Sequence, residues 1–260
     1  RNEEDETLLH RAAAHDDAKL VHLLLQRGAD PNVRDMNGWT PLTVAAKSGS
    51  LCVVDELLQA GADPRTMNDD RTTALHYLSA HSFADVALFN MIFRKLHLDD
   101  PELFNAQNRG LDTPLHYAVF GKAFLPVIRN LLDCPGIDVN LANKRKLTPL
   151  HVAIMIESEE VASLLLEHGA KVTDAMRKTA ARNDRILALL DRQQDEFEGL
   201  ADEETPEEAR KLISANLESH STRLDLTNTE LTSTPKSLLA CVHVRRLNLS
   251  RNRIEMIPRS

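Results

Sequence analysis

Aromatic side chains are scarce in this chain of 260 residues, which has seven Phe, two Tyr and one Trp, or 4% of the sequence. Sheet sandwiches depend on aromatic and β-branched side chains, so that class of fold is disfavoured. The hydrophobic content is nevertheless 42%. We therefore expect a core of small aliphatic side chains packed between closely stacked helices.

Cysteine is also rare, and long apolar runs are missing. The three cysteines, Cys52, Cys134 and Cys241, are far apart and odd in number, which argues against a disulfide framework and favours a reducing, cytoplasmic location. The sequence has no run of about 18 apolar residues and no apolar segment at its start. We therefore expect neither direct membrane insertion nor a signal peptide.

Catalytic motifs are missing as well. The sequence contains no glycine-rich phosphate loop, no Gly-Lys-Ser/Thr motif and no kinase catalytic motif. Its spacings bring together no nucleophile, acid–base pair or metal cluster. We therefore predict no catalytic, cofactor-binding or metal-ligating residue here, and the catalytic domains of an enzymatic parent would lie beyond residue 260.

The chain instead contains a repeated phrase, most complete as Thr148-Pro149-Leu150-His151. Its copies begin at Thr7, Thr40, Thr73, Thr113 and Thr148, so successive threonines are 33, 33, 40 and 35 residues apart. Threonine is a good helix N-cap, and proline suits the first helical position because no N–H is needed there. Each copy is predicted to start a helix.

A second apolar run follows each first one and ends at a glycine, as at Gly28, Gly61 and Gly169. Glycine can adopt the left-handed conformation that closes a helix. Between each glycine and the next threonine lie turn-forming residues such as Asp35-Met36-Asn37-Gly38, enough for a short hairpin finger.

This pattern of helix start, glycine stop and turn resembles the ankyrin repeat family over roughly the first 170 residues. The resemblance implies a mainly α solenoid in which each unit buries its apolar face against its neighbours. A sixth, degenerate capping unit is expected over Asp174 to Asp191, with helical apolar positions such as Ile186 and Leu190. We assign residues 1–190 to this domain.

The histidines of the phrase, at His10, His76, His116 and His151, belong to separate units. Stacked units would place them roughly 10 Å apart, too far to share a zinc ion. We expect them to form hydrogen bonds that tie a helix start to the neighbouring finger.

Candidate partner-binding residues lie on the fingers. Trp39 is the only tryptophan and is either an anchor for a partner or part of the packing along the finger row. Basic residues at predicted fingertips are Arg109, Lys144, Arg145 and Lys146. They suit an acidic partner or are simply solvated, and they are too few to indicate nucleic-acid binding. Asn140 occupies a place where the resembling family can undergo asparaginyl hydroxylation; the alternative is a structural turn asparagine.

The third unit is stretched, because Thr73 and Thr113 are 40 residues apart and no glycine stop follows Leu98. Either the extra residues form a loop that contributes to partner specificity, or phenylalanines such as Phe83, Phe89 and Phe93 fill a lengthened helix pair.

Composition changes abruptly after the sixth unit. Residues 191–208 contain nine acidic residues and one base, Arg192. The net charge of this segment is therefore −8, which equals the net charge of the whole chain. We assign 191–221 to an acidic linker with a helix that begins near Thr205-Pro206 and turns Leu212, Ile213 and Leu217 to one side.

A different repeat follows. Leu224 and Leu247 begin two similar segments 23 residues apart, and the second has an asparagine at Asn252. This resembles the leucine-rich repeat family, and implies a short strand in each repeat of an α/β horseshoe. We assign it residues 222–260 and expect the array to be cut short at Ser260.

Ankyrin repeats followed by leucine-rich repeats resemble the N-terminal region of leucine-rich-repeat kinases of the Roco type. Two functions follow. One is a non-catalytic interaction and scaffolding module of a signalling protein, whose partner is another protein. The other is an autoinhibitory or positioning arm that acts on another domain of the same chain, in a kinase with a GTPase domain.

Overall fold

The computed structural model describes residues 1–81, 85–96, 100–121, 125–199, 206–219, 223–231, 244, 246–250 and 252. The chain divides into two compact units, Arg1–Leu187 and Ala188–Ser260, with the boundary inside helix α13. The fold is mainly helical, and two short strands form the only sheet among the described residues. No helix in this part of the chain is both long and apolar enough to cross a membrane.

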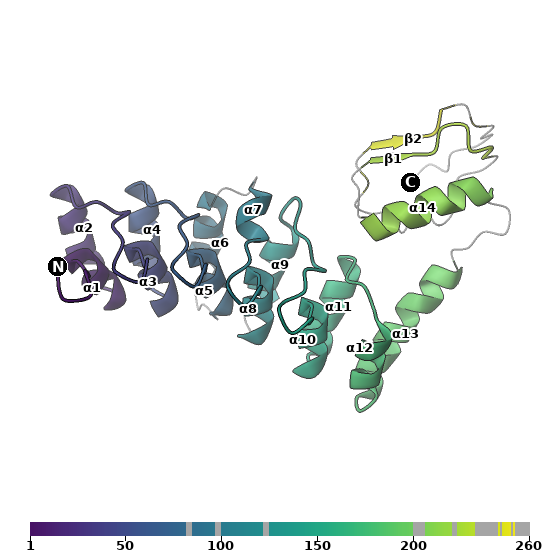
Figure 1. The fold of residues 1–260 in the computed structure, drawn as a ribbon, viewed down its shortest axis with the longest axis horizontal. Helices are drawn as coiled ribbons and strands as arrows, with labels where there is room; N and C mark the ends of the chain where they lie inside the picture. The colour runs from purple at the N-terminus through teal and green to yellow at the C-terminus, as the bar shows by residue number, and fades with distance from the viewer. Residues whose placement is uncertain are drawn as a thin grey trace. The chain divides into compact units, whose positions relative to one another are not determined.

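The first compact unit is a stack of helix pairs, one pair to each repeat (Figure 1). First helices contact first helices of the neighbouring pairs, and second helices contact second helices. The first helices are α1 (Leu8–Ala14), α3 (Pro41–Ser48), α5 (Ala74–Ala80), α8 (Pro114–Phe120), α10 (Pro149–Met155) and α12 (Asp174–Ala180). The second helices are α2 (Ala18–Gln26), α4 (Leu51–Gln59), α6 (Val86–Lys95), α9 (Leu125–Leu132), α11 (Glu159–Glu167) and α13 (Asp184–Gly199).

The predicted helix starts and stops are confirmed. The first helices of the five repeats that contain the phrase each begin at the residue after the threonine. The Thr40 and Thr148 hydroxyls accept bonds from the third amide of their helices, at 3.2 and 3.4 Å. Gly28 and Gly61 have φ values of +83° and +86°, in the left-handed region. The phrase therefore marks units of structure.

The core of this unit consists of small aliphatic side chains, as the composition predicts. Leu75 and Leu115 are fully buried, and so are Ala45, Ala118 and Ala153 of neighbouring first helices. The alanines let successive helices approach closely, since no side chain beyond Cβ separates their backbones. Each buried leucine contributes roughly 1.5–3 kcal/mol of transfer free energy.

The stretched third unit contains an extra short helix, α7 (Pro101–Phe104), after α6. Phe89, Phe93 and Phe104 are at most 3% exposed, and their ring centroids are 5.8 and 5.5 Å apart in succession. For these residues the filled helix pair is confirmed. Phe83 and the segment 97–99 lie outside the described residues.

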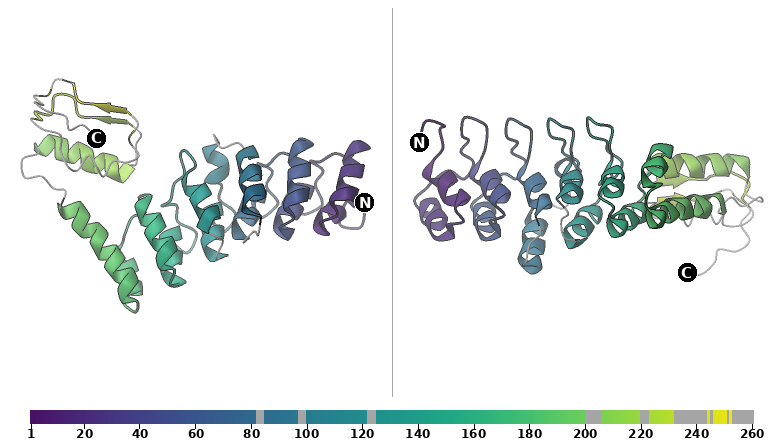
Figure 2. Two further views of the ribbon diagram at one scale, coloured as in Figure 1. Left: turned by 180° about the vertical axis from the view of Figure 1, so that it is seen from behind. Right: turned by 90° about the horizontal axis from the view of Figure 1, so that it is seen from below.

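The sixth unit keeps a helix pair but has no finger. Only three residues separate Gly169 from Thr173, whose hydroxyl accepts the Met176 amide at 3.4 Å and caps α12. Met176 and Ile186 are buried. The row of fingers therefore ends with the fifth unit, as the right-hand view of Figure 2 shows.

The second compact unit, Ala188–Ser260, packs helix α14 (Glu207–Ser219) against strands β1 (Arg223–Asp225) and β2 (Arg246–Asn248). The strands are parallel, with Leu224 opposite Leu247. The core contains Ala209, Ile213, Leu224, Leu226 and Leu231.

One detail of the predicted α14 face is wrong. Leu212 is 40% exposed, and Ala209 lies on the buried face with Ile213. Positions four residues apart share a helix face, whereas adjacent positions do not. Thr205 and the side chain of Leu217 lie outside the described residues. Residues 191–199 of the acidic stretch continue helix α13.

We expect Phe104→Ala to lower the free energy of unfolding of the first unit by about 3–5 kcal/mol, because it leaves a cavity beside Phe93. Phe120→Ala is the matched control, since Phe120 is 46% exposed, and should cost below about 0.5 kcal/mol. Urea unfolding followed by circular dichroism measures both. Equal losses would show that the α7 insertion is not part of the core.

Candidate binding surface

Five fingers project on one side of the helix pairs (Figure 2). They comprise residues 2–6, 35–39, 68–72, 108–112 and 143–147. Each begins five residues before its threonine with an Asn or Asp whose side-chain oxygen accepts backbone amides of its own finger. These residues are Asn2, Asp35, Asn68, Asn108 and Asn143, with bonds of 2.7–3.1 Å. The five-residue offset is constant along the sequence, yet these anchor residues were not among the predicted ones.

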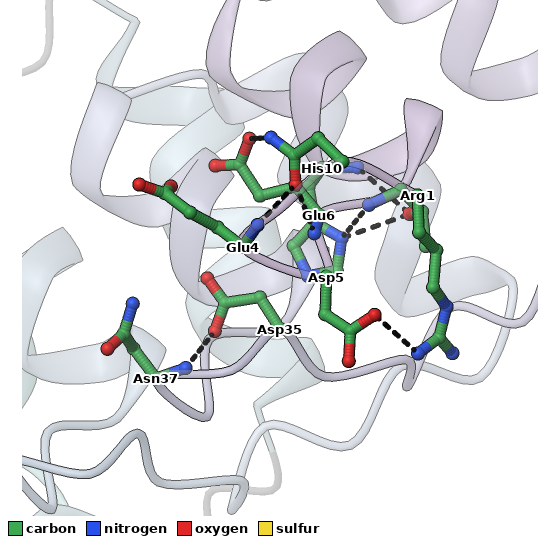
Figure 3. Close-up of polar contacts among 9 residues, drawn as sticks. Arg1, Glu4, Asp5, Glu6, His10, Asp35 and Asn37 are labelled. Carbon is green, nitrogen blue, oxygen red and sulfur yellow. Dashed lines mark hydrogen bonds and ion pairs between the residues drawn. The ribbon is translucent and has the colours of Figure 1, made fainter.

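The first finger shows the arrangement in detail (Figure 3). The amides of Glu4 and Glu6 both donate to Asn2 Oδ1, at 3.1 and 2.8 Å. Arg1 forms an ion pair with Asp5 at 3.3 Å. In the second finger, Asp35 accepts the Asn37 amide at 2.9 Å in the same way. Each tip is therefore held by its own anchor residue.

Backbone hydrogen bonds also join each finger to the one before it. The amides of Met36, Asp69, Arg109 and Lys144 donate to the carbonyls of Glu4, Asn37, Asp70 and Gly110, at 3.1, 3.0, 2.8 and 2.9 Å. The fingers therefore form one continuous strip. A surface ordered before binding loses less conformational entropy when a partner docks.

The predicted role of the histidines is confirmed for three of them. His10, His76 and His116 contact the carbonyls of Trp39, Asp112 and Leu147 in the next finger through Nε2, at 3.0, 3.1 and 2.9 Å. In each case Nδ1 accepts the amide of the threonine three residues earlier, at 3.1–3.2 Å. Since Nδ1 accepts, Nε2 must carry the hydrogen and donate it to the finger.

Burial favours the neutral form of three imidazoles, those of His76, His116 and His151. It lowers the pKa of His76 to about 4 and also lowers the pKa values of His116 and His151. Among the described residues, no three His, Cys, Asp or Glu side chains are grouped so that they could hold a metal ion.

Aromatic rings line the base of the fingers. Trp39 stacks on Tyr77 with centroids 5.2 Å apart, and Tyr77 meets Tyr117 edge to face at 6.2 Å. The Lys47 ammonium lies 4.7 Å from the centre of a Trp39 ring. All three rings are half-buried, so Trp39 packs along the row and still keeps exposed area. Its role as a partner anchor stays a prediction.

The predicted basic residues differ in whether they form ion pairs. Arg109 forms an ion pair with Asp70 of the third finger at 3.9 Å, with both side chains more than two-thirds exposed. Lys144, Arg145 and Lys146 are exposed and form no ion pair with any described residue. The fifth finger therefore offers three uncompensated positive charges.

Asn140 bridges two units with both ends of its amide. Its Nδ2 donates to the Gly169 carbonyl at 3.1 Å, and its Oδ1 accepts the Lys171 amide at 2.8 Å. Asn32 and Asn105 make the same pair of bonds in earlier units. This is the structural role among the two alternatives, and hydroxylation of Asn140 stays a prediction.

We define the finger surface as the five fingers together with the side chains of Tyr77 and Tyr117. It combines half-exposed aromatic rings with charged tips on a hydrogen-bonded strip.

The comparisons with known proteins agree with the repeat structure. A family model described as ankyrin repeats (3 copies) matches residues 9–91 and 86–176. The Bos taurus protein named mitochondrial disaggregase is 34% identical over 184 residues, which are 71% of this chain and 26% of that protein. A Dictyostelium discoideum protein named as a probable serine/threonine-protein kinase is 30% identical over 208 residues, 73% of this chain and 23% of that protein. The chain spans about a quarter of the length of these relatives.

We expect the first unit to lose stability as the pH falls from about 6.5 towards 4, the pKa of His76. In that window the unfolded chain binds a proton at His76 and the folded chain does not, so acid favours unfolding. The loss attributable to His76 is about 3 kcal/mol at most. Urea unfolding at neutral and mildly acidic pH measures it.

The matching variant is His76→Gln, which removes the titrating group. Its stability is expected to be lower at neutral pH, because the bond to Asp112 is altered, but less dependent on pH. An unchanged slope in the variant would exclude His76 as the source.

Proposed function

Because the chain belongs to the ankyrin repeat family, we propose that its first unit is a non-catalytic module that binds and scaffolds a protein partner on the finger surface. The observation that carries the proposal is the strip of fingers joined by backbone bonds, with exposed charged side chains at its tips. The location that fits best is the cytoplasm, on the basis of the few and scattered cysteines.

The composition of the finger surface supports this function. Tryptophan and tyrosine are enriched at positions that dominate binding energy in protein interfaces. Trp39 already stacks on Tyr77, which meets Tyr117 edge to face, so little side-chain freedom is left to lose. A stable complex would bury about 1,200–2,000 Å² in total, an area that requires several neighbouring fingers.

The second unit supports a proposal of its own, that it begins a leucine-rich repeat array. Its two strands pair with a 23-residue offset, from Leu224 to Leu247. Asn252 donates to the carbonyls of Leu226 and Leu249 at 2.6 and 3.0 Å, and accepts the amides of Thr229 and Leu231. One side chain thus closes the bends behind both strands.

A second candidate function is a regulatory arm of a larger enzyme. It is motivated by the similarity to the Dictyostelium kinase and by the order of the two repeat types, which resembles a Roco kinase. In this alternative the finger surface binds another domain of the parent chain, and holds it in an inactive or a productive position.

We expect a partner to be crosslinked from the fingers and not from the second helices. A photoreactive benzoylphenylalanine replaces Met36 at a fingertip, where the side chain is 60% exposed. Leu23 on α2 and Met91 on α6 are the matched control positions, exposed by 40% and 42%. After irradiation in cell extract, adducts are identified by mass spectrometry. Adducts from the controls alone would contradict the finger surface as the binding site.

Deleting residues 1–190 from the full parent chain separates the two functions. If the arm regulates catalysis, turnover of the parent's own reaction should change by at least about twofold, an effect of about 0.4 kcal/mol or more on the barrier. If turnover is unchanged while the crosslinked partner is lost, the regulatory alternative fails and the interaction module stands.

A further inference from the structure

Charge changes along the finger row from strongly negative to strongly positive. We compare the four residues between each anchor and the next threonine, that is 3–6, 36–39, 69–72, 109–112 and 144–147. Their net charges are −4, 0, −1, 0 and +3. The most acidic finger is the first and the most basic is the fifth, beyond which the sixth unit has no finger.

These charges are available to a partner. Glu3 and Glu4 are exposed at the first fingertip, although the neighbouring Asp5 is paired with Arg1. At the other end, Lys144, Arg145 and Lys146 have no ion-pair partner among the described residues. The Debye length is about 8–10 Å at moderate ionic strength, so a bound group responds mainly to the nearest finger.

Exposed apolar side chains end the first helices of the fourth and fifth repeats. Phe120 and Met155 are the last residues of α8 and α10, seven positions after their threonines, and are 46% and 57% exposed. Lys47 is the corresponding residue of α3, and its ammonium lies over the Trp39 ring. In the second repeat, a side chain at this position therefore reaches the base of its finger.

In the first three repeats, the residue at the same position is small or charged: Ala14, Lys47 and Ala80. Large apolar side chains occur there only in the fourth and fifth of the five fingered units. The basic charges and the exposed apolar groups thus occur at the same end of the row of repeats.

We propose that this end binds an acidic protein segment with large apolar side chains, and that the first finger attracts a basic continuation of the same segment. The inference rests on the proposed function, since it specifies the partner of the same surface. Acidic groups would pair with the fifth finger while apolar side chains cover Phe120 and Met155. The opposite charge at the first finger then fixes one direction of binding.

A nucleic acid fits less well than a protein segment. Three basic residues at one fingertip would contact few phosphates, and Glu3, Glu4, Asp69 and Asp70 on other fingers would repel the rest of the strand. Phosphate also gives nothing to bury against Phe120 and Met155. The chain's own acidic stretch, residues 191–208, is the competing occupant that the experiment must distinguish.

The test is selection from a displayed library of random peptides on the full chain. Three variants are compared with it: Lys144→Glu/Arg145→Glu/Lys146→Glu, Phe120→Ser/Met155→Ser, and a matched control, Lys19→Glu/Arg27→Glu/Arg94→Glu. The control reverses three exposed charges on the second-helix side and changes net charge equally. Thermal unfolding shows that each variant is folded, and Lys144→Arg/Lys146→Arg should retain binding.

We expect acidic, apolar peptides to be enriched on the full chain and on the matched control. The fifth-finger variant should lose the acidic preference and bind an enriched peptide at least about tenfold more weakly by fluorescence anisotropy. The Phe120/Met155 variant should lose the apolar preference. A spin label on the acidic end of the peptide should broaden amide signals of the fifth finger and not those of the first.

Other outcomes separate this inference from the interaction module itself. Enriched peptides without acidic preference, or unaffected by the fifth-finger variant, would overturn the inference and leave the module intact. Enrichment of acidic peptides only after the carboxylates of 191–208 are changed to amides would assign the site to the chain's own segment instead. No enrichment on any protein would count against both.

Discussion

The neutral imidazole of the repeated phrase is the contact on which the order of the first unit depends. Its Nδ1 accepts an amide in its own unit, and its Nε2 donates to the next finger, as His76 does toward Asp112. A charged imidazole could not accept a hydrogen bond at Nδ1. The bridge therefore requires the neutral imidazole, which is also the form that burial favours. The helix stack and the finger strip are thereby fixed relative to each other within this unit.

The exceptions show how the bridge is replaced where the histidine is missing. The second repeat has Thr43 in place of the histidine. Its hydroxyl bonds only within its own repeat, to Thr40. Between the second and third repeats, Trp39 stacks on Tyr77 and Arg34 donates to the Met67 carbonyl at 2.8 Å. In the fifth unit His151 keeps its bonds to Thr148, and no sixth finger exists to receive another. Contacts between neighbouring units are thus maintained while their chemistry differs.

Much of the fold was predictable because it depends on local rules at fixed spacing. Threonine caps, glycine stops and histidine bridges each need only the repeat period. The caps and stops are confirmed, and the bridges are confirmed for His10, His76 and His116. The anchors at Asn2, Asp35, Asn68, Asn108 and Asn143 were missed, although their offset from threonine is constant. The exposure of Leu212 was missed because the exact face of a helix depends on what it packs against. Whether Trp39 or Asn140 has a role beyond packing depends on a partner, which no local pattern encodes.

The same division explains where information about a partner should lie. Positions fixed by the scaffold, the anchor, the threonine and the histidine, are nearly alike in every unit because the stack needs them. The four residues between anchor and threonine are less constrained, since backbone amides join every pair of fingers. Side chains in these segments add a hydrogen bond from Asn143 to Asp112 and the Arg109–Asp70 ion pair. Their side chains are free to differ, and they do so with opposite charge at the two ends of the row. A difference that the scaffold does not require is best explained by what the surface binds.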